Sequence, residues 1–268
     1  MIVELFGPPG AGKTTLAHAI AAQLRTDGCK VNLRLSHRPG EQMPDVAHKA
    51  ETREEPKFIH TFYRLMRPAT ELLSAAGIAK GTPCGTAALV SMLPRAGVFQ
   101  TLRLRQYLTR LSSAWLRASE SCDVAIFDQA FVQAIASLLI LRPNISDTQV
   151  LAVIEAIPRS DLIILVHAPI PQIEWRLTRR RQSLGKVGCL FEESRGTVQD
   201  HVLVADRLND LLAQSGRKLL CIRSADDCLL DQTVQDVEVE ILRMLRMSAR
   251  SSIESIVPRG DVQWPIRS

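Results

Sequence analysis

The sequence predicts an α/β protein in which helices cover both faces of a parallel sheet, and two observations carry this prediction. Five short apolar segments alternate with longer segments in which apolar residues recur every three or four positions. Short apolar strands alternating with helices are typical of parallel sheets that are buried on both sides. The chain has 268 residues, of which 46% are hydrophobic and 23% charged, and this is enough for one substantial core.

The expected elements are bounded by ordinary turn and cap residues. We expect strands at 2–6, 31–35, 124–127, 162–167 and 219–222. We expect helices at 13–25, 58–66, 69–76, 99–119, 131–141, 147–157, 197–213 and 234–245, and one that carries 175–181. Gly28 ends the first helix, Ser146 or Asp147 caps the helix at 147–157, and Pro171 opens the helix that carries 175–181.

The charge and cysteine content narrows the class of protein. A formal net charge of +5 without an extended Lys/Arg-rich arm argues against nucleic-acid binding as the main role. The apolar runs are too short to span a membrane, and the first residues lack the cationic and apolar regions of a signal peptide. The six cysteines show no metal-binding spacing. We therefore expect a cytoplasmic protein that has no membrane span.

A glycine-rich loop lies between the first expected strand and the first expected helix. It follows the pattern Gly-x-x-x-x-Gly-Lys-Thr and continues into a second threonine: Gly7, Pro8, Pro9, Gly10, Ala11, Gly12, Lys13, Thr14 and Thr15. Glycine permits backbone angles that turn several N–H groups towards phosphate oxygens, and the helix start adds positive charge. In this pattern Lys13 reaches the β and γ phosphates and the Thr14 hydroxyl binds Mg²⁺. The loop predicts binding of a nucleoside triphosphate with Mg²⁺.

Asp128 comes directly after the expected strand at 124–127. Ligands of parallel sheets bind beyond the carboxyl ends of the strands. A carboxylate at that position can hold Mg²⁺ or accept the proton of an attacking hydroxyl. The alternative is an aspartate that only caps the next helix.

Arginines gather on and just past the helix that follows the fourth expected strand, at Arg176, Arg179, Arg180 and Arg181. Phosphoryl transfer needs positive charge over the migrating group, often from arginine on a mobile lid. We expect Arg176 and Arg180, which lie one helical turn apart on one face, to be catalytic within a lid over 176–196. The alternative is a solvated basic face.

Two further residues are candidates for binding a phosphoryl acceptor. Arg38 lies in the turn after the second expected strand, where it could hold an anion, although a Pro-Gly turn needs no ligand to explain it. Gln129 follows Asp128 and could contact the acceptor. It could equally order an attacking water in a hydrolytic protein.

Three segments of the chain resemble P-loop small-molecule kinases, most closely the thymidylate kinase-like branch of the nucleoside monophosphate kinases. They are GPPGAGKTT, CDVAIFDQAFVQAIASL and SDLIILVHAPIPQIEWRLTRRR, and SHRPG adds the family's Pro-Gly. The resemblance covers 1–40 and 120–225. It implies a P-loop NTPase fold with a five-stranded parallel sheet in the order 2-3-1-4-5, ATP as donor and Mg²⁺ as cofactor. It also implies a homodimer formed through the helices at 99–119 and 131–141.

The chain departs from this family on the acceptor side. The turn after the second strand reads Ser-His-Arg-Pro-Gly where the family has Thr-Arg-Glu-Pro-Gly, and Gln129 stands where the family has an arginine that helps to hold the acceptor phosphate. The acceptor is therefore left open.

We predict an ATP- and Mg²⁺-dependent phosphotransferase that acts on a small-molecule acceptor such as a nucleotide or nucleoside. Its domain would span 1–247, with an acceptor-side helical region at 41–119, and 248–268 would form a flexible tail. The alternative is a P-loop NTPase switch, or an ATPase, that acts on a protein partner.

Overall fold

The computed structural model describes residues 1–35, 89, 98–121, 123–183, 196–224 and 227–256. Its strands are β1 (Ile2–Phe6), β2 (Val31–Arg34), β3 (Val124–Phe127), β4 (Leu162–His167) and β5 (Leu219–Arg223). Its helices are α1 (Lys13–Thr26), α4 (Val98–Ser121), α5 (Phe131–Leu141), α6 (Asp147–Ala156), α7 (Ile170–Ser183), α9 (Val198–Gln214) and α10 (Asp227–Ile256). The helices expected at 58–66 and 69–76 lie outside the described residues.

The strands form one parallel sheet in the order β2-β3-β1-β4-β5, which confirms the predicted fold class and strand order. The central strand β1 pairs with β3 on one side and with β4 on the other, so that Val3 lies opposite both Ile126 and Leu162. Because all the strands run the same way, the turns that follow β1, β3 and β4 emerge at one edge of the sheet.

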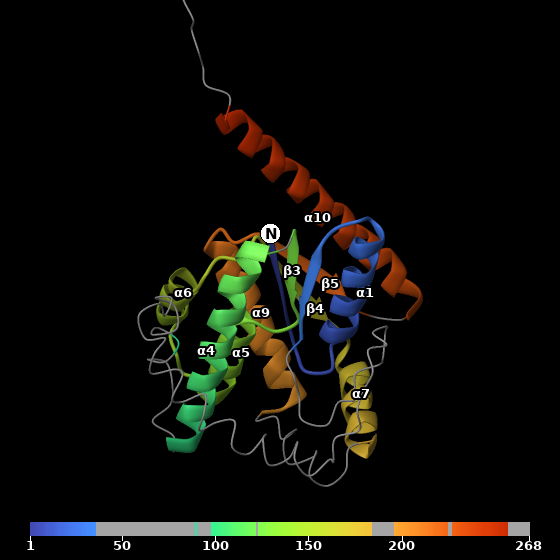
Figure 1. The fold of residues 1–268 in the computed structure, drawn as a ribbon. Helices are drawn as coiled ribbons and strands as arrows, with labels where there is room; N and C mark the ends of the chain where they lie inside the picture. The colour runs from blue at the N-terminus through green and yellow to red at the C-terminus, as the bar shows by residue number, and fades with distance from the viewer. Residues whose placement is uncertain (36–88, 90–97, 122, 184–195, 225–226, 257–268) are drawn as a thin grey trace, which may run out of the picture.

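Helices cover both faces of the sheet (Figure 1). Alternate residues of β1 point to opposite faces: Ile2 and Phe6 pack against α4, α5, α6 and α9, whereas Val3 and Leu5 pack against α1 and α10. On the α4 side, the Trp115 ring lies 5.2 Å from the ring of Phe127, measured between centroids. The edge of the sheet from which the turns after β1, β3 and β4 emerge is therefore supported by a packed core on each face.

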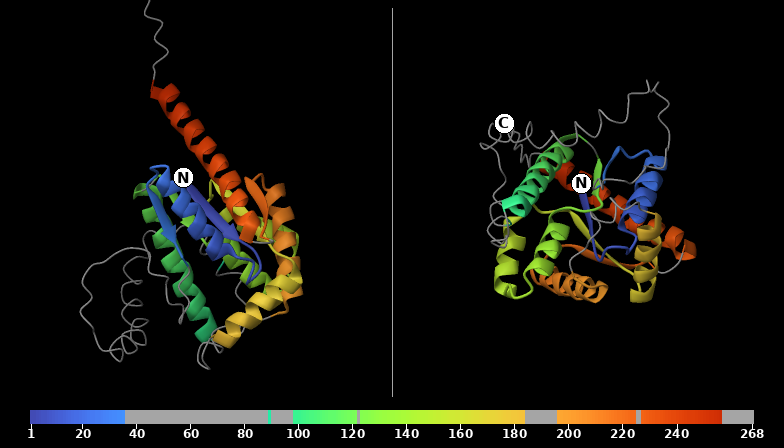
Figure 2. Two further views of the ribbon diagram at one scale, coloured as in Figure 1. Left: turned by 90° about the vertical axis from the view of Figure 1, so that its right-hand side faces the viewer. Right: turned by 90° about the horizontal axis from the view of Figure 1, so that it is seen from below.

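The closing helix is longer than the sequence analysis expected. The prediction placed it at 234–245, whereas α10 runs from Asp227 to Ile256. Its first part packs through Val234, Val237 and Ile241, and Figure 2 shows its C-terminal part leaving the body of the fold. α10 thus continues to 256, into the segment that was expected to form a flexible tail, and the flexibility of 248–268 stays a prediction. No described helix is both long and apolar enough to cross a bilayer.

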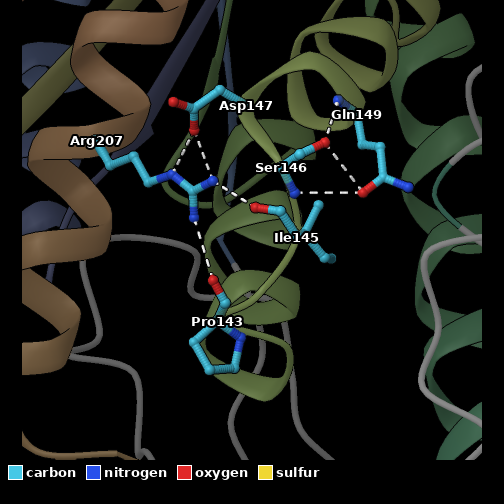
Figure 3. Close-up of polar contacts among 6 residues, drawn as sticks. All are labelled: Pro143, Ile145, Ser146, Asp147, Gln149 and Arg207. Carbon is cyan, nitrogen blue, oxygen red and sulfur yellow. Dashed lines mark hydrogen bonds and ion pairs between the residues drawn. The ribbon is translucent and has the colours of Figure 1, made fainter.

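Arg207 on α9 ties together the turn between α5 and α6 (Figure 3). Its guanidinium donates to the carbonyl oxygens of Ile145 at 2.5 Å and Pro143 at 3.5 Å. It also pairs with the Asp147 carboxylate at 2.6 Å. In the same turn, Ser146 caps α6 as predicted, in a reciprocal arrangement with Gln149. Because this turn connects two helices of the α4-side layer, Arg207 fixes how α6 and α9 meet.

Replacing Arg207 by alanine tests this contact. The Arg207→Ala change leaves the carbonyl of the buried Ile145 without its donor, so we expect a loss of about 1–3 kcal/mol in the free energy of unfolding. The measurement is urea unfolding followed by circular dichroism. Arg159→Ala is the matched control, because Arg159 is exposed and its ion pair with Glu155 lies at the surface; it should change stability by about 0.5 kcal/mol or less. Equal losses in the two variants would contradict the assignment.

Candidate functional site

The loop between β1 and α1 adopts a conformation that glycine makes possible. Gly7, Gly10 and Gly12 all have positive φ, at 143°, 83° and 98°. Gly7 also approaches β4 so closely that a Cβ atom there would lie 2.4 Å from the carbonyl oxygen of Val166. The pattern of glycines in the sequence is therefore required by both backbone angle and space.

Lys13 points back into this loop. Its side chain is buried, and its Nζ donates to the carbonyl oxygens of Gly7 at 2.7 Å and Pro8 at 2.8 Å. The ammonium group thus lies inside the curve of the loop, where the sequence pattern expects phosphate. Gly12 precedes α1 as its cap, so the first N–H groups of that helix face the same region.

The structure brings Thr14 and Asp128 together, as predicted. The Thr14 hydroxyl donates to Asp128 Oδ2 at 3.0 Å across 114 positions of sequence. Asp128 is buried, 1% exposed, and its backbone N–H donates to the carbonyl oxygen of Arg34 at the end of β2. A hydroxyl and a carboxylate at one point form a set of hard oxygen donors. Thr15 is exposed next to this pair, and Gln129 is half-buried beside Asp128.

The start of α5 holds the loop through a residue that the sequence analysis missed. Gln133 Oε1 accepts from the backbone N–H of Gly7 at 3.1 Å. Nothing in the sequence around Gln133 distinguishes it from an ordinary helical glutamine. The signal in the sequence is its place in the first turn of the helix after Asp128. The parallel pairing of β1 with β3 brings this turn next to the P-loop.

Arg176 is the predicted lid residue that the structure places at the loop. Its Nη1 donates to the carbonyl oxygen of Gly10 at 3.4 Å and to the Ser224 hydroxyl at 3.5 Å. Ser224 follows β5, and the sequence analysis did not select it. All four predicted arginines lie on α7, and the role of Arg180, one turn beyond Arg176, stays a prediction. Arg38 and the lid beyond 183 lie outside the described residues.

The loop, the buried Asp128 after β3 and the strand order together decide the fold. The chain has a P-loop NTPase fold. A model of the "ATPase family associated with various cellular activities (AAA)" matches residues 3–70, a stretch that contains the P-loop and β2.

Solved structures of a deoxyadenosine kinase from M. mycoides are also similar to the chain. The structure with dCMP and a flexible dCDP bound is 14% identical, with a TM-score of 0.48 over 91% of this chain and 100% of that one. The structure with dATP is 15% identical, with a TM-score of 0.44 over 92% and 100%.

Two polar residues on the α4 face lie near Asp128 and extend the site beyond the P-loop. Arg34 ends β2, and its buried Nε has no hydrogen-bond partner among the residues that the structure describes. Tyr107 lies on α4; burial raises the pKa of its hydroxyl, and the carboxylates of Glu4 and Asp128 raise it further. Tyr107 packs against the core on this face of the sheet. Sequence reasoning missed Arg34 because it examined the residues after each strand rather than the last residue within it.

Glu4 is a buried acid in the middle of the central strand. It is 0% exposed and shares the α4 face of β1 with Ile2 and Phe6. Its Oε1 accepts from the backbone N–H of Val132 at 2.5 Å, whereas Oε2 accepts no hydrogen bond of ordinary geometry within the described part of the chain. Burial raises the pKa of Glu4 to about 7, although the Val132 hydrogen bond and the charge of Arg217 work in the opposite direction.

A pair of glycine substitutions tests the P-loop geometry. Gly7→Ala places a Cβ against the Val166 carbonyl at a positive φ, so the loop must move; we expect a lower melting temperature and at least a tenfold loss of ADP affinity, about 1.4 kcal/mol. Gly28→Ala is the control, because Gly28 also has positive φ but an added Cβ meets nothing within 4 Å. Calorimetric titration with ADP compares the two. An unchanged affinity in Gly7→Ala would rule out the close contact.

The Glu4 carboxyl makes stability depend on pH. Its pKa is raised from an ordinary 4.5 to about 7 in the folded chain, so the stability that it contributes is complete below about pH 4.5 and is lost as the pH rises towards 7. Glu4→Gln cannot ionise. We therefore expect this variant to gain stability relative to the wild type between pH 5 and 8, by an amount on the order of 1–3 kcal/mol. Thermal unfolding across this range measures the difference, with Glu155→Gln at an exposed position as the matched control.

Proposed function

We propose that the protein is an ATP- and Mg²⁺-dependent phosphotransferase that acts on a small-molecule acceptor, either a nucleoside or a nucleotide. One observation supports this most directly. Asp128 is buried at the end of β3, and its Oδ2 accepts from the Thr14 hydroxyl at 3.0 Å. A P-loop threonine and a carboxylate after a neighbouring strand form the pair of oxygen donors that a nucleotide-bound magnesium ion needs.

The donor set suits Mg²⁺ by its chemistry. Magnesium prefers hard oxygen ligands and usually keeps several waters, so one hydroxyl and one carboxylate are a sufficient protein contribution. Thr14 and Asp128 would hold the ion, and the ion would supply charge neutralisation between the β and γ phosphates. The described residues contain no cluster of three or more His, Cys, Asp or Glu side chains for a different kind of metal site.

The chain's own cations would neutralise the phosphates. Lys13 lies inside the loop on the carbonyls of Gly7 and Pro8, and it would exchange these contacts for phosphate oxygens. Arg176 already contacts the loop at Gly10, on the side of β5. In the transfer, the bond from the γ phosphorus to the ADP oxygen breaks and a bond to the acceptor oxygen forms. The acceptor proton passes to Asp128 or to solvent.

The acceptor side supports transfer to a molecule other than water. Arg34 ends β2, where its carbonyl oxygen accepts from the Asp128 N–H, and Tyr107 lies on α4, which covers the same face of the sheet. A cation and a hydroxyl together can bind a polar or anionic acceptor. The resemblance of the chain to nucleoside monophosphate kinases supports a nucleoside or nucleotide in this role.

A P-loop ATPase or switch acting on a protein partner is the second candidate. The AAA match over 3–70 favours it, and so does Gln129, a half-buried amide next to Asp128 that could order an attacking water. This candidate predicts ATP hydrolysis that no small acceptor stimulates.

Acceptor-dependent ADP release separates the two candidates. The protein is incubated with ATP and Mg²⁺ and screened against nucleosides, nucleoside monophosphates, sugars and antibiotics. We expect at least one compound to stimulate ADP release, and Lys13→Ala to lower that rate by about 10²–10³-fold, since a charge-stabilising donor is lost. Lys30→Ala, at an exposed position outside the loop, is the control. Near-normal turnover by Lys13→Ala, or ADP release that no acceptor changes, would count against the proposal.

A further inference from the structure

Hydrogen bonds made by Glu4 and Gln133 connect β1, the first turn of α5 and the start of the P-loop. Glu4 Oε1 accepts from the Val132 N–H in the first turn of α5, at a separation of 128 positions. The next residue of that turn, Gln133, accepts from the N–H of Gly7, which begins the P-loop three residues after Glu4. The contacts therefore form a closed ring from β1 to α5 and back to the end of β1.

The first turn of α5 follows closely after Asp128, the residue whose carboxylate accepts from the Thr14 hydroxyl. Asp128 lies in the short connection between β3 and α5, and Val132 is the second residue of α5, so the place of the Asp128 side chain depends on where this helix begins. The cap residue of α5, Ala130, offers no side-chain hydrogen bond. Glu4 supplies a carboxylate to this helix start from the neighbouring strand, in place of a local cap.

We propose that Glu4 is a positioning residue, which fixes the start of α5 and thereby sets both the P-loop and Asp128 for nucleotide binding, and that it takes up a proton when nucleotide binds. The inference rests on the nucleotide-binding part of the proposed function. It adds a residue that touches neither phosphate nor metal.

The surroundings of Glu4 explain why its carboxyl would take up a proton. Among the described residues Oε2 accepts no hydrogen bond of ordinary geometry, although the Ser160 hydroxyl before β4 lies close enough to lower the pKa of the carboxyl. Arg217 before β5 acts on the carboxylate only through its charge, and Tyr107 on α4 is a neutral neighbour. A buried carboxylate with one free oxygen binds a proton more readily than an exposed one.

Nucleotide binding brings negative charge to this carboxyl. Gly7 lies three residues along the strand from Glu4, roughly 10 Å at the usual rise, and the low-dielectric core between them screens little. A phosphate chain in the P-loop therefore favours the protonated form of Glu4. Where half of the molecules already hold the proton, at a pH equal to the pKa of the carboxyl, uptake is limited to about half a proton per site.

Two substitutions distinguish the role of the hydrogen bond between Glu4 and Val132 from the role of proton uptake by Glu4. Glu4→Gln keeps an oxygen for the Val132 N–H but cannot titrate, whereas Glu4→Leu removes the acceptor and leaves that N–H unpaired. We expect Glu4→Leu to bind ADP about tenfold or more weakly than Glu4→Gln. Near pH 7, ADP titrations in buffers of different ionisation enthalpy should show proton uptake by the wild type that Glu4→Gln lacks. The proton equilibrium of ADP itself cancels in this comparison.

Either of two results would overturn the inference: equal ADP affinity in Glu4→Leu and Glu4→Gln, or equal proton uptake in the wild type and Glu4→Gln. Should Glu4→Leu not fold, carboxyl-carbon NMR of the ¹³C-glutamate-labelled wild type decides. One glutamate carboxyl should have a titration midpoint near pH 7, and this midpoint should shift to higher pH when ADP is added. If every glutamate titrates in the ordinary range, the inference is overturned. These tests measure ADP binding and not phosphoryl transfer. If the protein binds ADP but phosphorylates no acceptor, the proposed function fails while the role of Glu4 in nucleotide binding still stands.

Discussion

The parallel pairing of β1 with both β3 and β4 is the constraint from which the site follows. With Val3 opposite Ile126 on one side and Leu162 on the other, the three strands end at a common edge. The loop after β1, the carboxylate after β3 and the helix after β4 then share one small volume. Neither Asp128 nor Arg176 has a local reason to approach the loop, and the register of the sheet brings both to it.

The P-loop conformation is set from outside as well as by its own glycines. The Val166 carbonyl approaches Gly7 from β4, Gln133 holds the N–H of Gly7 from α5, and Arg176 contacts Gly10 from α7. Each contact comes from a different element that flanks the same edge. A preformed loop loses little conformational freedom on binding phosphate, which is how such sites gain affinity.

The sequence alone was sufficient where the informative pattern was local. Lys13 and Thr14 belong to a continuous motif, and Asp128 stands at a recognisable strand end, so all three could be selected before the fold was known. Glu4 and Gln133 could not, because each acts on a residue more than 120 positions away and looks ordinary among its neighbours. The strand order was implied by resemblance, since periodicity does not record which strands are neighbours.

The long closing helix has two halves with different environments. Val234, Val237 and Ile241 anchor the first half in the core shared with α1, whereas Met247 in the second half is 59% exposed. Figure 2 shows the C-terminal part of α10 leaving the body of the fold. Amide protons in the projecting half can exchange with solvent by local fraying, but those in the anchored half must wait for the core to open. One continuous helix thus reports two separate opening events, and its exchange profile along the chain marks where the globular body ends.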